Sequence, residues 1–145
     1  MRPSIQLSLL IVVSLFAVCT GQAQSNKKGA ASASHVKQLE VVYFHSEHRC
    51  KTCLEIEKQT RAVLDKHFSK EVKSGNIVLK TYNVDEKANL KVCQKFDAFG
   101  SSLFLNKIAG GKEEQKNLTD FAFTNAFNAK AFEGKLVSYI RQNLP

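Results

Sequence analysis

Residues 41–53 have the sequence VVYFHSEHRCKTC, and this stretch decides the fold class. Its first half belongs to an apolar run over residues 38–44, rich in β-branched and aromatic residues, which predicts a buried strand. Its second half ends in Cys50 and Cys53, which stand three residues apart where a helical pattern begins. A strand that leads into a cysteine pair at the head of a helix predicts a thiol site at the end of that strand.

The segment after the cysteine pair predicts a helix, a strand and a second helix. Apolar residues recur on one helical face of the first segment, and Gly75 suits the end of that helix. A second strand is expected over residues 77–84, after which Asp85 is expected to cap a helix that runs to about Phe96. The apolar face of the first helix consists of Cys53, Ile56, Val63, Leu64, Phe68 and Val72.

The last third of the chain predicts a hairpin and a closing helix. Strands over residues 103–105 and 115–118 are expected on either side of a turn at Gly110-Gly111. Residues 119–127 stay open between strand and helix, because two phenylalanines alternate there while a Thr-Asp pair suits a helix cap. From Asn128 onward a closing amphipathic helix is expected. Its apolar face consists of Phe132, Leu136, Tyr139, Ile140 and Leu144.

The order of these elements defines an α/β architecture. Strands that alternate with helices favour parallel pairing, while the glycine hairpin adds an antiparallel edge. We therefore predict a central mixed four-stranded sheet with helices on both faces, formed by residues 37–145.

The N-terminus has the three parts of a secretory signal peptide, which we place at residues 1–23. Arg2 supplies a positive start, and residues 7–18 form an apolar run that is too short to span a bilayer comfortably. Small residues stand at both ends of the Gly-Gln-Ala sequence over residues 21–23, so cleavage is expected after Ala23. The chain is therefore expected to be periplasmic or secreted, with no transmembrane helix after signal removal.

Two alternatives accompany this prediction. Gly21 is the second choice for cleavage. Lipid attachment at Cys19 is a less favoured route, because Val18 is bulkier than the small residue usual before such a cysteine. Residues 24–36 are rich in Ser, Ala, Gly and Lys without periodicity, which predicts a flexible leader before the domain.

The charge of the chain does not indicate a nucleic-acid partner. The formal net charge is +8, from 21 basic and 13 acidic residues. The lysines are spread along the chain, without an arginine-rich block and without the aromatic–basic alternation that suits stacking on bases. We interpret this charge as a solvated surface.

Export changes the interpretation of the four cysteines, because disulfides persist outside the cytoplasm. Cys19 is expected to leave with the signal peptide, and the odd number that remains argues against a pure disulfide scaffold. Cys50 and Cys53 form the predicted working pair. Cys93, on the second helix, is predicted to be a small buried core residue, with a third redox or metal thiol as the alternative.

The expected position of Cys50 favours a thiolate. Unpaired backbone N–H groups and the helix dipole stabilise an anion at a helix N-terminus, and Arg49, Lys51 and His48 add positive charge. We expect the pKa of the Cys50 thiol to fall from ~8.5 into the range ~3.5–7.5. Cys53 would face the core and stay protonated, so Cys50 is the predicted nucleophile and Cys53 the resolving thiol.

A structural metal site is the alternative use of the same residues. His45 and His48 lie near the cysteines in sequence and would complete a four-ligand set. The order strand, cysteine pair, helix favours redox chemistry instead, so we interpret the histidines as a polar rim. No glycine-rich strand–turn–helix suited to a dinucleotide is present, and no flavin or nicotinamide cofactor is expected.

With these elements in place, residues 37–143 resemble the thioredoxin superfamily. The stretch over residues 41–53 and the segment NLTDFAF over residues 117–123 are similar to a bacterial group of small exported proteins, the nitrophenyl-compound nitroreductase subunit (ArsF-like) family. This resemblance implies a thioredoxin-like fold, a redox-active disulfide, and a protein disulfide or thiol as partner. A membrane thiol transporter is one such partner.

The chain departs from thioredoxin at three places. Its two prolines are the third and the last residues, so the cis-proline opposite the cysteine pair is replaced by Ser101 or Ser102. Tyr43 aligns with the buried acid of the first strand, which removes the usual proton acceptor. The dipeptide Lys51-Thr52 between the cysteines is expected to shift the reduction potential.

The sequence thus predicts an exported thiol–disulfide oxidoreductase that exchanges electrons with a protein partner. Cys50 and Cys53 would carry the reaction, with His48, Arg49, Lys51 and Ser101 in support. The alternatives are a soft-metal or metalloid binding module that uses Cys50, Cys53 and His48 or Cys93, and a non-catalytic subunit of a larger redox complex.

Overall fold

The computed structural model describes residues 37–144. The predicted signal peptide, the predicted leader and Cys19 lie outside the described residues, and so does Pro145. Within residues 37–144, no helix is long and apolar enough to cross a membrane.

Four strands and five α-helices make up this part of the chain. The strands are β1 (Gln38–His45), β2 (Ile77–Asn83), β3 (Ser102–Ala109) and β4 (Lys112–Asn117). The helices are α1 (Lys51–His67), α2 (Ser69–Lys73), α3 (Leu90–Phe96), α4 (Thr119–Asn125) and α5 (Ala129–Asn143), and a short 3-10 helix, η1 (Lys87–Asn89), precedes α3.

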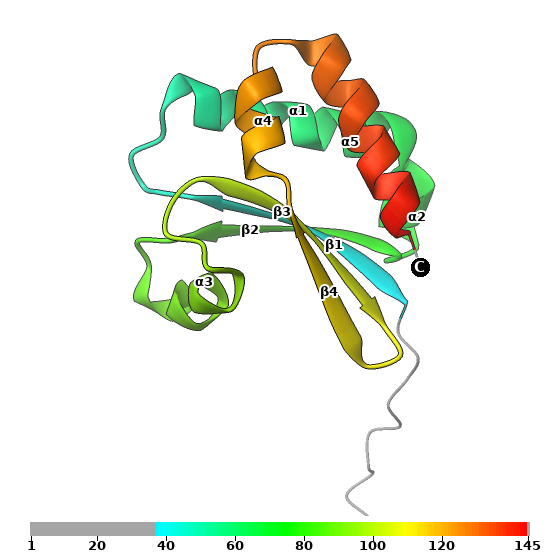
Figure 1. The fold of residues 1–145 in the computed structure, drawn as a ribbon, viewed down its shortest axis with the longest axis horizontal. Coiled ribbons are helices and arrows are strands. Elements are labelled where there is room, and N and C mark those ends of the chain that lie inside the picture. Colours follow the sequence, from blue (N-terminus) through cyan, green and yellow to red (C-terminus); the bar gives the residue numbers. More distant parts are fainter. Residues whose placement is uncertain (1–36, 145) are drawn as a thin grey trace, which may run out of the picture. The chain divides into compact units, whose positions relative to one another are not determined.

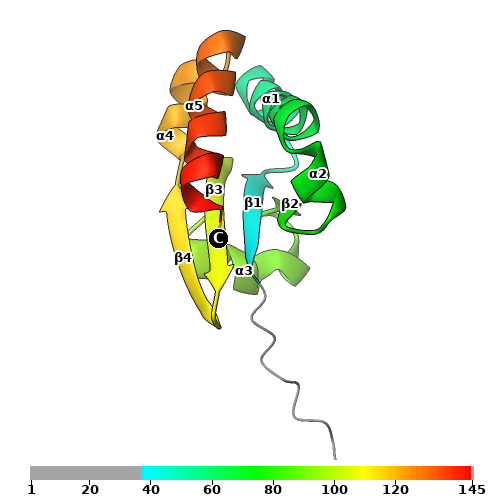
Figure 2. The same cartoon turned by 90° about the vertical axis from the view of Figure 1, so that its right-hand side faces the viewer.

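The strands form one mixed sheet in the order β2-β1-β3-β4 (Figures 1 and 2). Strand β1 pairs in parallel with β2 and antiparallel with β3, and β3 pairs antiparallel with β4. The turn between β3 and β4 places Gly110 and Gly111 at φ of 59° and 76°, as the two-residue hairpin turns that suit strand twist require. The predicted mixed four-stranded sheet is confirmed.

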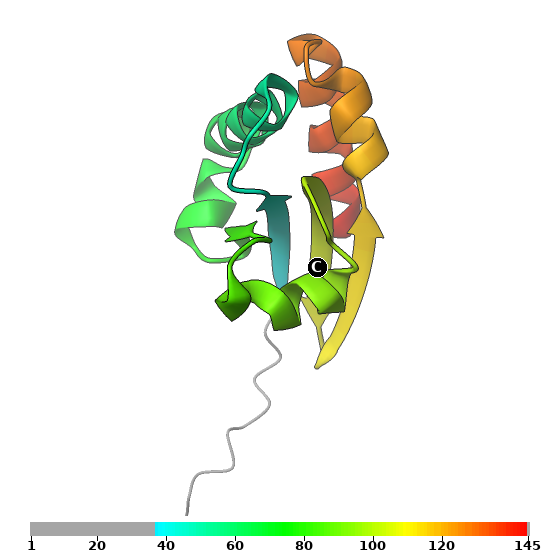
Figure 3. The same cartoon turned by 90° about the vertical axis from the view of Figure 1, so that its left-hand side faces the viewer.

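Helices cover both faces of the sheet (Figures 1 and 3). On one face, Leu39, Val41 and Tyr43 of β1 pack with the apolar sides of α1, α4 and α5. On the other face, Val42 and Phe44 pack against α3. Since successive side chains of a strand point to opposite faces, the unbroken apolar run over residues 41–44 of β1 contributes side chains to both cores.

Three local predictions are wrong. The helix after the cysteine pair does not continue to Gly75, because it breaks at Phe68 and resumes as α2, which leaves Val72 38% exposed. Phe68 is buried, so its packing decides where the chain turns.

Asp85 caps no helix: its carboxylate accepts a hydrogen bond from Glu47 N at 2.7 Å. The fourth strand begins earlier than expected and ends before Leu118.

The open segment over residues 119–127 is mainly helical, as α4. The hydroxyl of Thr119 accepts a hydrogen bond from Leu103 N at 3.2 Å, which ties the start of α4 to β3. In the closing helix α5, Asn128 is the N-cap, and its side chain accepts from Ala131 N at 3.1 Å. The predicted closing helix is therefore confirmed.

Truncation of Phe132 tests the core between α5 and the sheet. This residue has no exposed surface, so Phe132→Ala is expected to lower the free energy of unfolding by about 3–5 kcal/mol through lost burial and a cavity. Urea unfolding followed by circular dichroism measures the change. Phe123→Ala is the matched control, because that ring is 40% exposed, and its cost is expected to stay near or below about 1 kcal/mol. Equal losses in the two variants would contradict this account of the core.

Candidate functional site

The two predicted cysteines form a disulfide at the end of the central strand. A loop over residues 46–50 joins β1 to α1, and Cys50 is the N-cap residue of α1. Its Sγ accepts a hydrogen bond from Cys53 N at 3.2 Å. Cys50 is exposed, whereas Cys53, in the first turn of the helix, is 6% exposed. One sulfur is therefore open to a partner, and the other is shielded behind it.

Basic residues flank this disulfide. Lys51 is the exposed first residue of α1, His48 is exposed in the loop, and the first turn of α1 contains no acidic residue. Positive charge and free backbone N–H groups at a helix N-terminus both stabilise an anion there. The surroundings of Cys50 thus favour a thiolate once the disulfide is reduced.

The loop before the disulfide is anchored to the neighbouring segment of the chain. Glu47 N donates to Asp85, and Val84 N donates to His45 O at 2.8 Å. Within the loop, Ser46 Oγ donates to His48 O at 3.0 Å. These bonds fix where α1 begins relative to β1 and β2.

Tyr43 lies beneath the disulfide and joins several parts of the site. Its side chain is fully buried, and its hydroxyl donates to Cys53 O at 2.7 Å. The Arg49 guanidinium carbon lies 5.6 Å from the centre of the Tyr43 ring. Burial raises the pKa of the Tyr43 hydroxyl, and the neighbouring hydrogen-bonding groups of Arg49 and Ser101 act in the opposite direction.

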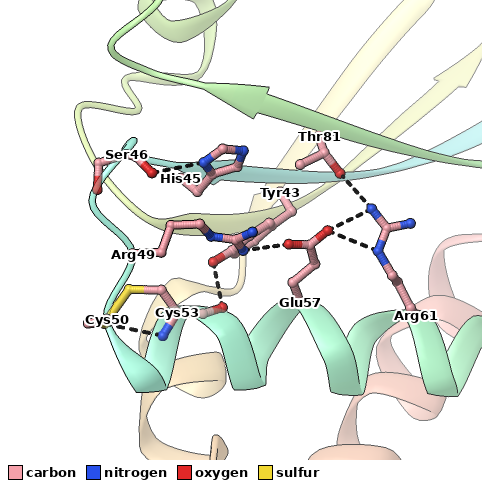
Figure 4. A network of polar contacts seen from close by, with 9 residues as sticks. All are labelled: Tyr43, His45, Ser46, Arg49, Cys50, Cys53, Glu57, Arg61 and Thr81. Atoms are coloured by element: carbon pink, nitrogen blue, oxygen red, sulfur yellow. Dashed lines mark hydrogen bonds and ion pairs between the residues drawn. A yellow bond between two sulfur atoms is a disulfide. The ribbon is translucent and has the colours of Figure 1, made fainter.

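A chain of ion pairs continues from Arg49 along the side of α1 that faces the sheet (Figure 4). Arg49 pairs with Glu57, and the other oxygen of Glu57 accepts from Arg61 Nε at 2.9 Å and from Arg61 Nη2 at 2.6 Å. Arg61 Nη2 also lies 3.5 Å from the hydroxyl of Thr81 on β2. The site is thus connected to the edge strand through alternating charges.

Burial and neighbouring charges act in opposite directions on the pKa values of Glu57 and Arg49. Burial by itself raises the pKa of Glu57, but the hydrogen bonds and charges of Arg61 and Arg49 together hold it below its usual value. Burial acts to lower the pKa of Arg49, and its bonds to Glu57 and Tyr43 outweigh that effect and raise it. Both groups therefore stay charged around neutral pH.

Sequence reasoning named Arg49 as a cation near Cys50 but missed its partners. Glu57 lies one helical turn beyond Cys53, and Arg61 lies one turn beyond Glu57, so the i, i+4 spacing was a usable signal. The role of the Tyr43 hydroxyl could not be found in this way, because it depends on how β1 and α1 pack.

The structure does not assemble the alternative metal set. Among the described residues, no group of three or more His, Cys, Asp or Glu side chains is placed to hold a metal ion. His45 Nδ1 lies 2.9 Å from Ser46 O, and His48 is exposed in the loop. Cys93 is 4% exposed on the α3 side of the sheet, and burial raises the pKa of its thiol, as expected of a core residue.

The topology and the position of the cysteine pair define a thioredoxin-like α/β fold. A parallel β1–α1–β2 unit is followed by the β3–β4 hairpin and a closing helix, and the pair stands at the N-terminus of α1. This fold and the Cys-x-x-Cys spacing fit a thiol oxidoreductase.

No family model and no curated protein matches the chain. The solved structures that resemble it include a malarial protein, at 14% identity over 74% of this chain and 99% of that chain, with a TM-score of 0.47. Thioredoxin from Fasciola hepatica is 21% identical over 73% of this chain and 81% of that chain, with a TM-score of 0.45. A thioredoxin from Thermus thermophilus is 19% identical over 72% of each chain, with a TM-score of 0.47.

Removal of the Glu57 charge tests the ion-pair chain. Glu57→Gln is expected to lower the free energy of unfolding at neutral pH by about 1.5–3 kcal/mol, the scale of a charged hydrogen bond. The pKa of Glu57 is lower in the folded state than in the unfolded state, so its stabilising effect is complete above the unfolded pKa of about 4.3 and is lost as the pH falls through the folded value.

Urea unfolding of both proteins over a pH series checks this. The gap between wild type and Glu57→Gln should be constant around neutral pH and should close in acid. Glu114→Gln, an exposed position on β4, is the control and should change stability little at any pH. A gap that persists unchanged into strong acid would show that the Glu57 charge is not the cause.

Proposed function

We propose that this chain is a thiol–disulfide oxidoreductase that exchanges electrons with a protein partner through Cys50 and Cys53. The observation that carries the proposal is the asymmetric disulfide at the N-terminus of α1. Its exposed sulfur belongs to the N-cap residue, and its shielded sulfur belongs to the first turn of the helix. In disulfide exchange, the accessible sulfur of such a pair forms the mixed disulfide with the partner, and the protected sulfur resolves it.

In the oxidising direction, a partner thiolate attacks Sγ of Cys50. A sulfur–sulfur bond forms between the partner and Cys50, the Cys50–Cys53 bond breaks, and its electron pair stays on Cys53 as a thiolate. The partner's second thiol then loses its proton to water and attacks the first partner sulfur. This forms the partner's disulfide and breaks the partner–Cys50 bond, whose electron pair stays on Cys50 as a thiolate. The partner is released oxidised, and Cys50 and Cys53 remain as the reduced pair. In the reducing direction the same steps run backwards, with Cys50 as the attacking thiolate.

The site supports the class of partner, whereas the proposed location rests on the sequence. The exposed position of Cys50 favours a macromolecular thiol over a small molecule held in a deep pocket. A membrane thiol transporter is our proposed partner, and kinship to the ArsF-like nitroreductase subunit group is proposed with it. We place the reaction outside the cytoplasm on the basis of the N-terminal signal pattern.

Single cysteine variants test the assigned roles. Cys50→Ser is expected to abolish exchange, because the exposed sulfur is gone. Cys53→Ser is expected to accumulate mixed disulfides with disulfide-bearing partners, because the Cys50 thiolate attacks the partner's disulfide and no resolving sulfur remains. Intact-mass analysis after incubation with a disulfide-containing peptide measures both. A Cys53→Ser protein that forms no mixed disulfide, while Cys50→Ser does, would reverse the assignment.

The reduction potential of the pair tests the function as a whole. Metal-free protein equilibrated with glutathione buffers should give one two-electron transition, expected between about −120 and −270 mV. Metal analysis of the purified protein under reducing conditions runs beside it. If the thiols resist oxidation, or if they hold soft metal stoichiometrically, the binding-module alternative replaces the oxidoreductase.

A further inference from the structure

One donor beneath the disulfide has no acceptor. Arg49 Nε is buried and makes no hydrogen bond among residues 37–144, although the rest of the guanidinium pairs with Glu57 and lies over Tyr43. A buried N–H of a charged group without a partner is costly, and it calls for an explanation. The disulfide state does not supply one.

The guanidinium of Arg49 lies against the tyrosine that is bonded to Cys53. Its central carbon is 5.6 Å from the centre of the Tyr43 ring, and the Tyr43 hydroxyl is 2.7 Å from Cys53 O. Arg49 is therefore linked to the peptide group of Cys53 through the Tyr43 side chain. Figure 4 shows the side chain running from the loop beside Cys50 toward Tyr43 and Glu57, on the side of α1 that faces the sheet.

Reduction creates the acceptor that is missing. When a thiolate attacks the exposed Sγ of Cys50, the bonding electron pair moves to Sγ of Cys53, which becomes a thiolate in a position that is 6% exposed. A buried anion needs a paired charge, because burial otherwise disfavours its charged form. Of the cations next to the pair, Lys51 is exposed at the helix start, whereas Arg49 lies underneath with a free buried donor.

We propose that Arg49 is the donor that stabilises the Cys53 thiolate when it leaves the disulfide. This inference rests on the proposed function, since it concerns one step of the exchange. Glu57 holds the guanidinium in place, and the second cation on Glu57, Arg61, leaves the cluster with a surplus of positive charge. The Tyr43 hydroxyl fixes the backbone of Cys53 relative to the same guanidinium.

The rate of disulfide reduction by dithiothreitol tests this inference. An opposite charge within a few ångströms lowers a pKa by ~1–3, and exchange rates respond to thiol pKa with a slope of ~0.5, so Arg49→Met should be reduced roughly 3- to 30-fold more slowly than wild type. Lys58→Met removes the same charge from an exposed position on α1 and should be reduced at the wild-type rate. Arg49→Lys keeps a cation and should recover part of the lost rate.

The pH dependence of cysteine alkylation reports the apparent pKa of the thiol pair. A purely structural role of Arg49 would not change this pKa. In reduced protein, Arg49→Met should raise the apparent pKa of the thiol pair, whereas Lys58→Met should leave it in place. A rate and a profile in Arg49→Met that match wild type would overturn the inference. If Arg49→Met does not fold, Arg49→Lys decides: unchanged rate and profile overturn it, and a slower rate with a raised pKa supports it.

Failure of the proposed function would look different. In that case wild type itself would show no glutathione-dependent redox transition, whatever the residue at position 49.

Discussion

Strand β1 contributes side chains to both cores. Five of its six residues from 39 to 44 have no exposed surface, and the sixth, Glu40, is 6% exposed. A strand buried on both faces must be central, so β1 pairs on both sides and its neighbours are placed by register. Because β1 leads straight into the loop before α1, the burial of this strand also fixes where the cysteine pair emerges. The site is thus a consequence of the core.

On the core side of the cysteines lie the hydroxyl of Tyr43 and the ion pair of Arg49 with Glu57. Tyr43 occupies a fully buried position and donates to the peptide of Cys53, while Glu57 on α1 carries the carboxylate of the site. Two guanidiniums, from Arg49 and Arg61, face that carboxylate, which keeps it ionised. An Arg-paired carboxylate is a weak base, so this arrangement is better suited to stabilising sulfur anions than to accepting protons.

Much of the fold was predictable because the relevant signals are local. The apolar run of β1, the amphipathic face of α5 and the Gly110-Gly111 turn each depend on a few neighbouring residues. The errors arose where packing overrides local preference. Phe68 breaks the first helix by inserting into the core, and Asp85 binds the loop before the disulfide instead of capping a helix.

The sequence by itself determined the order of the four strands, the mixed sheet, the closing helix and the placement of Cys50 and Cys53 at a strand–helix junction, because periodicity and spacing are properties of neighbouring residues. Only the tertiary structure decided what lies under the disulfide. Tyr43, Arg49 and Glu57 come from a strand, a loop and a helix, and they meet because β1 and α1 pack face to face. Likewise Glu40, within an apolar strand, is satisfied by Lys80 and Asn106 from two other strands. Which side chains become partners depends on their distance in the folded structure, and the spacing of residues along the chain does not give that distance.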